Sequence, residues 1–252
     1  MSDPLEPLRP AFYARPSGSG LRRLSDWWLV LHPPYTLWHL TYVAIGATIA
    51  PRFDGGRLAA TLIAFFLGVG VAAHALDELH GRPLKTAIPG RLLIAAAATS
   101  LTGAGALGVV GIGRVGVGLA VFIVVGIVLT CAYNLELFGG RLHNDITFAT
   151  AWGAFPVLTA YYAQTATIRF PAVAAAVAAY WLSRAQRSLS RPARDLRRRV
   201  AAIDGTITYR NGTRIPLSTT ALLEPLETAL TMMSYAVVAL AVALLAYRLS
   251  TR

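Results

Sequence analysis

Residues 74–86 hold the first concentration of side chains that could bind a metal ion and a phosphate. On a helix, His74, Asp77 and Glu78 are spaced i, i+3 and i+4, so they share one face. Carboxylates are the hard oxygen ligands that Mg²⁺ prefers, and Mg²⁺ commonly keeps water and substrate phosphates as its other ligands. Arg82 and Lys85 follow and could bind the phosphate oxygens directly. The alternative is a helix end with solvated charges and a histidine that only packs.

A second polar segment, residues 133–145, could complete such a site. Asp145 precedes an apolar stretch, where it could bind the metal or cap the next helix by accepting backbone N–H bonds. Gly139 and Gly140 permit a tight backbone, and Arg141 adds a guanidinium that suits phosphate. The other polar side chains of this segment are Tyr133, Asn134, Glu136, His143 and Asn144.

Half of the twelve carboxylates fall at the cytoplasmic ends of the membrane spans that are predicted below. Ionisable groups at membrane depth are costly and usually face a cavity or a partner. We therefore expect the two polar segments to meet across one pocket. These six residues are Asp77, Glu78, Glu136, Asp145, Glu224 and Glu227.

The elements that must position these residues are apolar helices. The chain has 252 residues, 55% hydrophobic and 14% charged, with a mean hydropathy of +0.54. This composition excludes a disordered chain and argues against an ordinary soluble domain. We predict an all-α fold, a polytopic transmembrane bundle of about seven spans, because a span needs about twenty residues. The spans are expected near residues 33–50, 58–76, 92–110, 115–133, 146–165, 170–187 and 225–247.

The same pattern divides the chain into four parts. The first is a cytoplasmic leader ending in an interfacial segment, where Trp27 and Trp28 would lie at the level of the lipid headgroups. The next three are the first six spans, an arginine-rich cytoplasmic segment and the last span. The boundaries are 1–32, 33–187 with polar cytoplasmic loops 77–91 and 134–145, 188–224, and 225–252.

The distribution of basic residues predicts the orientation. Of the 23 lysines and arginines, 17 fall on the side of the N-terminus in the seven-span arrangement and 6 on the other side. By the positive-inside rule the N-terminus is cytoplasmic and the C-terminus lies outside a multi-pass protein of the cell membrane. The net charge of +11 therefore indicates topology and contact with anionic lipid headgroups, most of all around residues 191–199, and no nucleic-acid partner is expected.

A small cytoplasmic hairpin is predicted near residues 206–216. Two β-prone runs flank Asn211-Gly212, a dipeptide that accepts positive φ at both central positions of a type I′ turn. We expect this hairpin to lie over the cytoplasmic face.

Two regions of the chain resemble the UbiA superfamily of intramembrane prenyltransferases, as a short and divergent member. One is the acidic box that runs into Arg82-Pro83-Leu84, and the other extends from the polar loop after Tyr133 through Gly153 and Pro156 to Tyr161-Tyr162-Ala-Gln164. The match covers about a third of the chain. With Asp77 at the central acidic position of the family's first box, His74 and Gly81 stand where the family has acids.

The resemblance implies an enzyme that transfers an isoprenyl group from a polyprenyl diphosphate to a lipophilic acceptor with the help of Mg²⁺. Asp77, Glu78 and Asp145 would hold the metal, and Arg82, Lys85, Arg141 and Tyr133 would bind substrate. His74, His143 or Asn144 would orient the acceptor or take its proton.

Two other functions stay open. A membrane terpene cyclase would keep the ionisation step and use no acceptor. A non-catalytic lipid-binding or transport protein would keep the bundle without a metal site, and the acids missing from the first box favour it.

Overall fold

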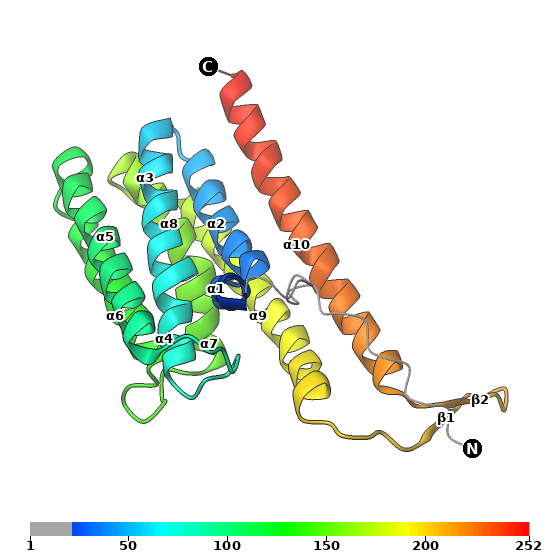
Figure 1. Cartoon of the computed structure of the whole chain (residues 1–252). Helices are drawn as coiled ribbons and strands as arrows, with labels where there is room; N and C mark the ends of the chain where they lie inside the picture. The colour runs from blue at the N-terminus through cyan, green and yellow to red at the C-terminus, as the bar shows by residue number, and fades with distance from the viewer. Residues whose placement is uncertain (1–21, 252) are drawn as a thin grey trace.

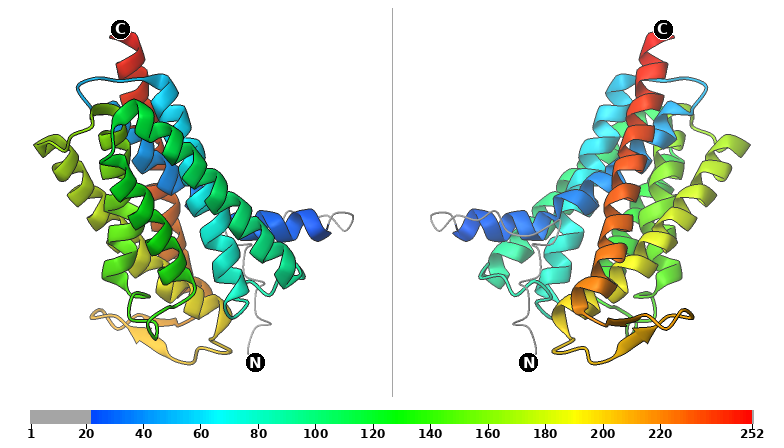
Figure 2. Two further views of the ribbon diagram at one scale, coloured as in Figure 1. Left: turned by 90° about the vertical axis from the view of Figure 1, so that its left-hand side faces the viewer. Right: turned by 90° about the vertical axis from the view of Figure 1, so that its right-hand side faces the viewer.

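The protein is a bundle of helices whose connections alternate between two ends, as a computed structural model of the chain shows (Figure 1). The structure describes residues 22–251, so the first 21 residues of the expected leader lie outside the described part. The helix α1 (Arg22–Leu31) lies across the bundle instead of along it (Figure 2). The end that carries loops 80–89 and 135–144 is called the polar end below.

Each expected span coincides with a helical segment. Three of the described helices are long and apolar enough to cross a membrane, Gly55–Leu79, Gly90–Val115 and Thr219–Ser250, and Leu119–Asn134 is a shorter apolar helix. The prediction of a mostly helical protein is confirmed, and these three helices are candidate membrane spans. The segments are α2 (Pro33–Thr48), α3 (Gly55–Phe65) with π-helical η1 (Phe66–Ala73) and α4 (His74–Leu79), α5 (Gly90–Val115), α6 (Leu119–Asn134), α7 (Asp145–Ala149) with π-helical η2 (Thr150–Ala154) and α8 (Phe155–Thr165), α9 (Phe170–Arg198), and α10 (Thr219–Ser250).

Two boundaries differ from those predicted. α9 continues without interruption past residue 187 to Arg198, because its arginines occupy one face while small residues such as Ser183 and Ala193 bury the other. α10 begins at Thr219, where the Ser218 hydroxyl caps the helix by accepting a hydrogen bond from the Ala221 amide. Pro225 therefore lies inside the helix.

The hairpin is present, but its turn is not the predicted one. β1 (Thr206–Thr208) and β2 (Arg214–Pro216) pair antiparallel, and Tyr209 and Thr213 close a three-residue loop. Only Gly212 in that loop has positive φ, at 85°, which is typical of a type I turn followed by a glycine bulge and not of type I′. All six strand residues are exposed, and the hairpin extends sideways beyond the base of α10 instead of covering the polar end (Figure 1).

Close backbone packing holds the helices that carry the site. A Cβ added at Gly46 of α2 would lie 2.9 Å from the Val157 Cα of α8. One added at Gly153 of η2 would lie 2.6 Å from the Ala179 carbonyl oxygen of α9. Glycine at these positions therefore brings α2, η2, α8 and α9 into direct contact.

Candidate functional site

The two polar segments meet at the polar end of the bundle. The Glu136 carboxylate lies 3.7 Å from His80 Nε2, in the first segment, and 3.7 Å from His143 Nδ1, in its own segment. Asp77 is within electrostatic range of His143 and Glu136. The two segments therefore contact each other through Glu136 and His80.

Tyr133 lies where the charged groups from three elements converge. Its ring stacks on His143 at 4.5 Å between centroids and packs against Trp152 of η2 at 5.8 Å. The residue is 4% exposed, and its hydroxyl has no hydrogen-bond partner among the described residues. Asp77 and Asp145 interact with it electrostatically, together with Arg187 and Arg194 of α9.

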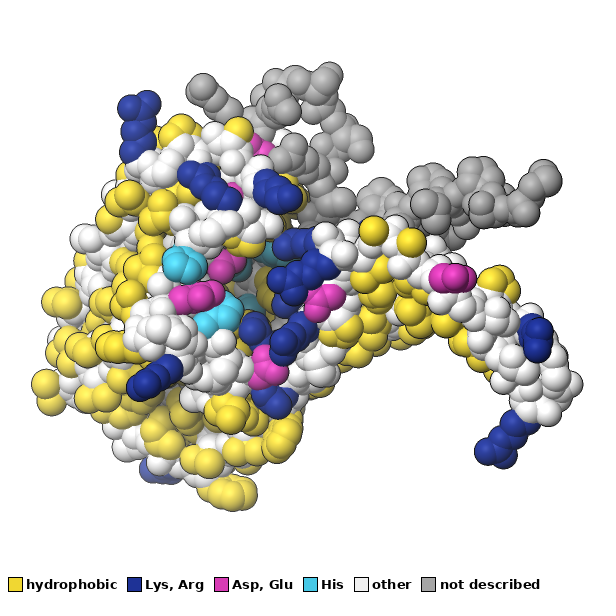
Figure 3. All heavy atoms as spheres, turned by 90° about the horizontal axis from the view of Figure 1, so that it is seen from below, with side chains coloured by type: hydrophobic (Ala, Val, Ile, Leu, Met, Phe, Trp, Pro, Cys, Tyr) yellow, Lys and Arg dark blue, Asp and Glu magenta, His cyan; other side chains and the backbone are white. Residues whose placement is uncertain are grey.

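The arginines of α9 form the opposite wall, a feature that the sequence interpretation missed. Five of them recur at intervals of three or four residues, the spacing that places side chains on one helix face. Figure 3 shows arginines facing histidines and acids across a hollow at the polar end. The 184–198 spacing could have revealed this face, but the arginines were interpreted only as determinants of topology and as contacts for anionic lipid headgroups. They are Arg184, Arg187, Arg191, Arg194 and Arg198.

Two of these arginines make specific contacts at the site. Arg187 Nε donates to Asp145 at 2.5 Å, and its guanidinium lies 4.8 Å over the Phe148 ring. Arg194 Nη1 donates to the Tyr35 hydroxyl at 3.5 Å. The hydrogen bond from Arg187 holds the pKa of Asp145 below its ordinary value.

His39 is a second residue that the sequence interpretation missed. Its Nδ1 donates to the Tyr35 carbonyl at 2.5 Å, and its buried Nε2 has no partner among residues 22–251. The ring lies 6.3 Å from both Phe148 and Trp152, the aromatic residues that also contact Tyr133. The signal in the sequence is a lone histidine inside an apolar span.

His32 joins the histidines at the junction of α1 and α2. Its ring centroid lies 6.0 Å from that of His74 and 4.4 Å from that of Tyr35. Burial, reinforced by the neighbouring His74 and by the charges of Arg194 and Arg198, lowers the pKa of His32 to about 3. His32 is therefore neutral at physiological pH.

Glu78, a predicted metal ligand, is fully buried and has a different set of partners. Its carboxylate accepts from the Leu84 amide at 2.9 Å and from the amide and hydroxyl of Thr86 at 2.8 Å each. These bonds hold the loop after α4. Glu78 thus points to loop 80–89.

The three predicted Mg²⁺ ligands do not form one group. Glu78 binds a loop, Asp145 pairs with Arg187, and Asp77 is within electrostatic range of His143. Within the described part of the chain, no three His, Cys, Asp or Glu side chains are close enough together to hold a metal ion. This donor set does not fit Mg²⁺ bound by all three acids.

The remaining predicted residues lie around the rim or in the loops. Asn144, not Asp145, caps α7, since its Oδ1 accepts from the amides of Ile146 and Thr147. Arg82 Nη1 donates to the Ile88 carbonyl at 2.6 Å, while Lys85 and Arg141 are exposed. His74 Nδ1 donates to the Gly70 carbonyl at 3.1 Å.

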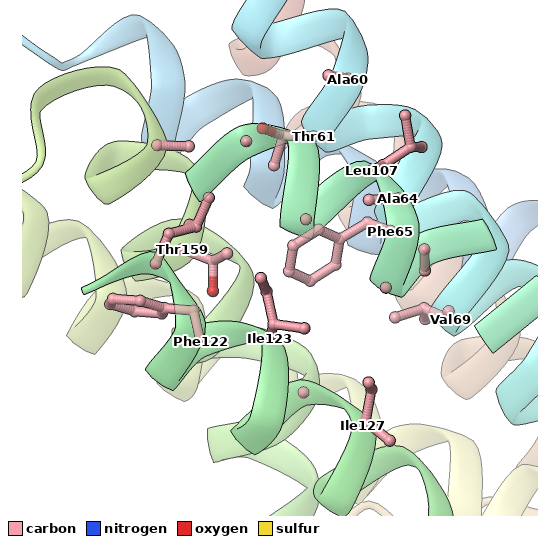
Figure 4. Close-up of a pocket in the computed structure, with 18 of the residues that line it drawn as sticks. Ala60, Thr61, Ala64, Phe65, Val69, Leu107, Phe122, Ile123, Ile127 and Thr159 are labelled. Atoms are coloured by element: carbon pink, nitrogen blue, oxygen red, sulfur yellow. The ribbon is translucent and has the colours of Figure 1, made fainter. Parts of the chain in front are cut away.

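The name polar cluster is used below for His74, Asp77, Tyr133, His143, Asp145, Arg187 and Arg194. An apolar cavity of about 200 Å³ begins beside this cluster. It lies between α3–η1, α5, α6 and α8, and Phe65 and Ile123 point into it (Figure 4). Trp152 lines the cavity and also contacts Tyr133 and His39, so one side chain borders both spaces. The cavity extends to Arg114, near the opposite end of the bundle.

Comparison with known proteins gives no relative for this arrangement. No family model, no curated protein and no solved structure matches the chain.

Proposed function

We propose that this protein binds a polyprenyl diphosphate in the membrane and transfers its isoprenyl group to a lipophilic acceptor. The observation that carries the proposal is the junction at Trp152. On one side are Arg187, Arg194 and the buried hydroxyl of Tyr133, a donor with no hydrogen-bond partner among the described residues, and on the other is an apolar cavity. A ligand with an anionic head and a hydrocarbon tail matches both sides.

Arg187 and Arg194 take the main electrostatic role in the proposed reaction. The allylic C–O bond breaks, and its electron pair leaves with the diphosphate, whose growing charge the guanidinium groups stabilise. The acceptor forms its new bond to that carbon and loses a proton to Nε2 of His143, whose ring is oriented by the hydrogen bond that Nδ1 donates to the Tyr133 carbonyl at 3.1 Å. Because the acids do not fit a shared Mg²⁺ site, no step is assigned to the metal.

We propose that the protein is a multi-pass protein of the cell membrane with its polar end in the cytoplasm. The 17 to 6 distribution of basic residues supports this orientation, with the C-terminus outside. Exposed arginines at the polar end, such as Arg191 and Arg198, would contact anionic lipid headgroups.

The test is diphosphate release by the full-length protein in lipid nanodiscs, with farnesyl or geranylgeranyl diphosphate, with and without Mg²⁺. We expect Arg194→Gln to lower the rate about tenfold or more, because a charge-assisted hydrogen bond contributes about 1.5–3 kcal/mol. The matched control is Arg199→Gln, since Arg199 is exposed and pairs with Asp195 at 3.4 Å.

Full activity in Arg194→Gln, or no diphosphate release with any acceptor, contradicts the proposal. Hydrocarbons or terpene alcohols formed from the diphosphate alone would indicate a terpene cyclase. The aromatic wall of Tyr133, Phe148 and Trp152 could stabilise the carbocation that a cyclase needs.

A second candidate is a lipid-binding or transport protein without catalysis. The observation that favours it is that Glu78 and Asp145 are both engaged in internal contacts. A thermal shift produced by farnesyl diphosphate, unchanged by Mg²⁺ or by Asp77→Ala and without turnover, would support this candidate.

A further inference from the structure

A second cavity lies beside the polar cluster, between α2, α9 and α10. Its volume is about 60 Å³, which is room for two waters or for a hydroxyl group with its adjoining carbons, since water occupies about 30 Å³ in the liquid. His32 and Tyr35 line it from the start of α2, and Ser234 lines it from α10. Arg194, which the proposed reaction uses on the side of Tyr133, also lines this cavity.

Gln186 of α9 presents an unsatisfied acceptor to this cavity. The residue is 2% exposed, and its Oε1 has no hydrogen-bond partner among residues 22–251. An unpaired buried acceptor destabilises a protein by about 1–3 kcal/mol. A hydrogen-bond donor in the cavity would remove this penalty.

The other polar groups of the wall offer mainly acceptors. Thr231 and Ser234 donate their hydroxyl protons to carbonyls of their own helix, at 2.8 Å each, so that oxygen lone pairs are what they can offer. Arg194 and the Tyr35 hydroxyl are donors of this wall, and the two hydrogen bonds of Arg194 in the described structure, to Tyr35 and Ser190, both come from Nη1. A ligand that donates a hydrogen bond to Gln186 Oε1 and accepts one from Arg194 would satisfy both residues.

Glu227 closes the cavity toward the polar end. Both of its carboxylate oxygens accept hydrogen bonds from Arg197, one of them at 2.6 Å from Nη2, and this pair joins α10 to α9. A second anion here would face this carboxylate and the acceptor oxygens of the wall, which disfavours a phosphate or carboxylate ligand. A carbonyl ligand could not donate to Gln186.

We propose that this cavity binds the hydroxyl group of a lipophilic alcohol or phenol. A hydroxyl can donate a hydrogen bond to Gln186 and accept one from Arg194. Because the outer face of α10 is apolar and exposed, the carbon chain of the ligand can extend into lipid. Arg194 also interacts with Asp77 and Tyr133, which places the hydroxyl next to the polar cluster. That this alcohol or phenol is the prenyl acceptor rests on the proposed function. That the cavity binds its hydroxyl group does not.

The test uses a long-chain fatty alcohol with a diazirine near its hydroxyl and the corresponding methyl ether, which lacks the donor. Each is photo-crosslinked to the full-length protein in nanodiscs, and mass spectrometry locates the labelled peptides. We expect the alcohol to label the α9 and α10 segments about tenfold more than the ether, and Gln186→Leu to reduce this ratio to about one. Ser188→Ala, at an exposed position two residues along α9, is the control.

A second variant guards against misfolding of the first. Ser234→Leu fills the cavity from α10 and should abolish labelling by both probes, while Ser250→Leu at the exposed end of the same helix should not. Equal labelling by alcohol and ether, as expected if water alone fills the cavity, or an unchanged ratio in Gln186→Leu, overturns the proposal.

Diphosphate release from farnesyl diphosphate is measured on the same proteins without alcohol. Selective labelling with no diphosphate release leaves the hydroxyl site standing and removes the prenyltransferase. Diphosphate release with unselective labelling supports the prenyltransferase and overturns the hydroxyl site.

Discussion

Glu78 shows how the surroundings of a side chain decide what its chemistry is used for. Its type and its spacing from Asp77 suit a metal, yet three donors from loop 80–89 occupy its carboxylate. Asp77, one residue earlier, faces His143 and Arg194 instead. Adjacent acids on one helix thus have different roles, one structural and one at the candidate site.

The structural role of Glu78 predicts a loss of stability in Glu78→Ala. The amides of Leu84 and Thr86 would lose their acceptor, and we expect the free energy of unfolding to fall by about 1–3 kcal/mol, whether or not Mg²⁺ is present. Thermal unfolding and the rate of proteolysis in loop 80–89 measure the effect.

Glu224→Ala, at an exposed position of α10, is the control for that measurement and should change little. Unaltered stability of Glu78→Ala combined with a lost response to Mg²⁺ would instead make Glu78 a metal ligand.

The helices carry the site through two devices, close glycine contacts and π-helical turns. η1 ends just before His74, and η2 contains Trp152, so both irregular turns adjoin residues of the polar cluster. A π-helical turn shifts the following side chains around the helix axis, and such turns are frequent at functional sites. The glycines then set how closely these helices approach α2 and α9.

Gly46→Ala is expected to separate α2 from α8. Its new Cβ would lie 2.3 Å from the Val157 carbonyl oxygen, which is backbone and cannot rotate away, so we expect a loss of about 1–3 kcal/mol and a lower melting temperature. Gly113→Ala in α5 is the matched control, because nothing lies within 4 Å of its added Cβ. Equal melting temperatures for the two variants would mean that α2 and α8 are not packed this closely.

The bundle as a whole has two ends that carry different elements. The polar loops, the arginine face of α9 and the hairpin are at one end, and the C-terminus is at the other (Figures 1 and 2). If this separation follows the membrane, the polar end contacts the cytoplasm and the apolar cavity lies within the bilayer.

Cysteine labelling tests this orientation. In a Cys131→Ala background, which removes the single native cysteine, Arg114→Cys and Arg210→Cys place one exposed thiol near each end. We expect a membrane-impermeant maleimide added to intact cells to label Arg114→Cys, and to label Arg210→Cys only after permeabilisation. The opposite result would invert the topology and place the polar cluster outside.

Local patterns in the sequence were sufficient to predict the helical segments, the hairpin and the enrichment of polar residues near the ends of certain helices. Hydropathy and periodicity act within a few turns, so they do not depend on which helices become neighbours. The turn type failed because a glycine bulge and a type I′ turn use the same Asn-Gly dipeptide.

Packing between distant segments decided which polar groups share the site. It placed Thr86 against Glu78, Arg187 against Asp145 and Trp152 between an arginine-lined hollow and an apolar cavity. Such pairings depend on helix rotation and on backbone contacts such as Gly46 with Val157, which no local pattern encodes. The sequence by itself therefore determined which residues have side chains that could bind a ligand. The three-dimensional contacts decided which of these side chains stabilise the fold and which lie at the candidate site.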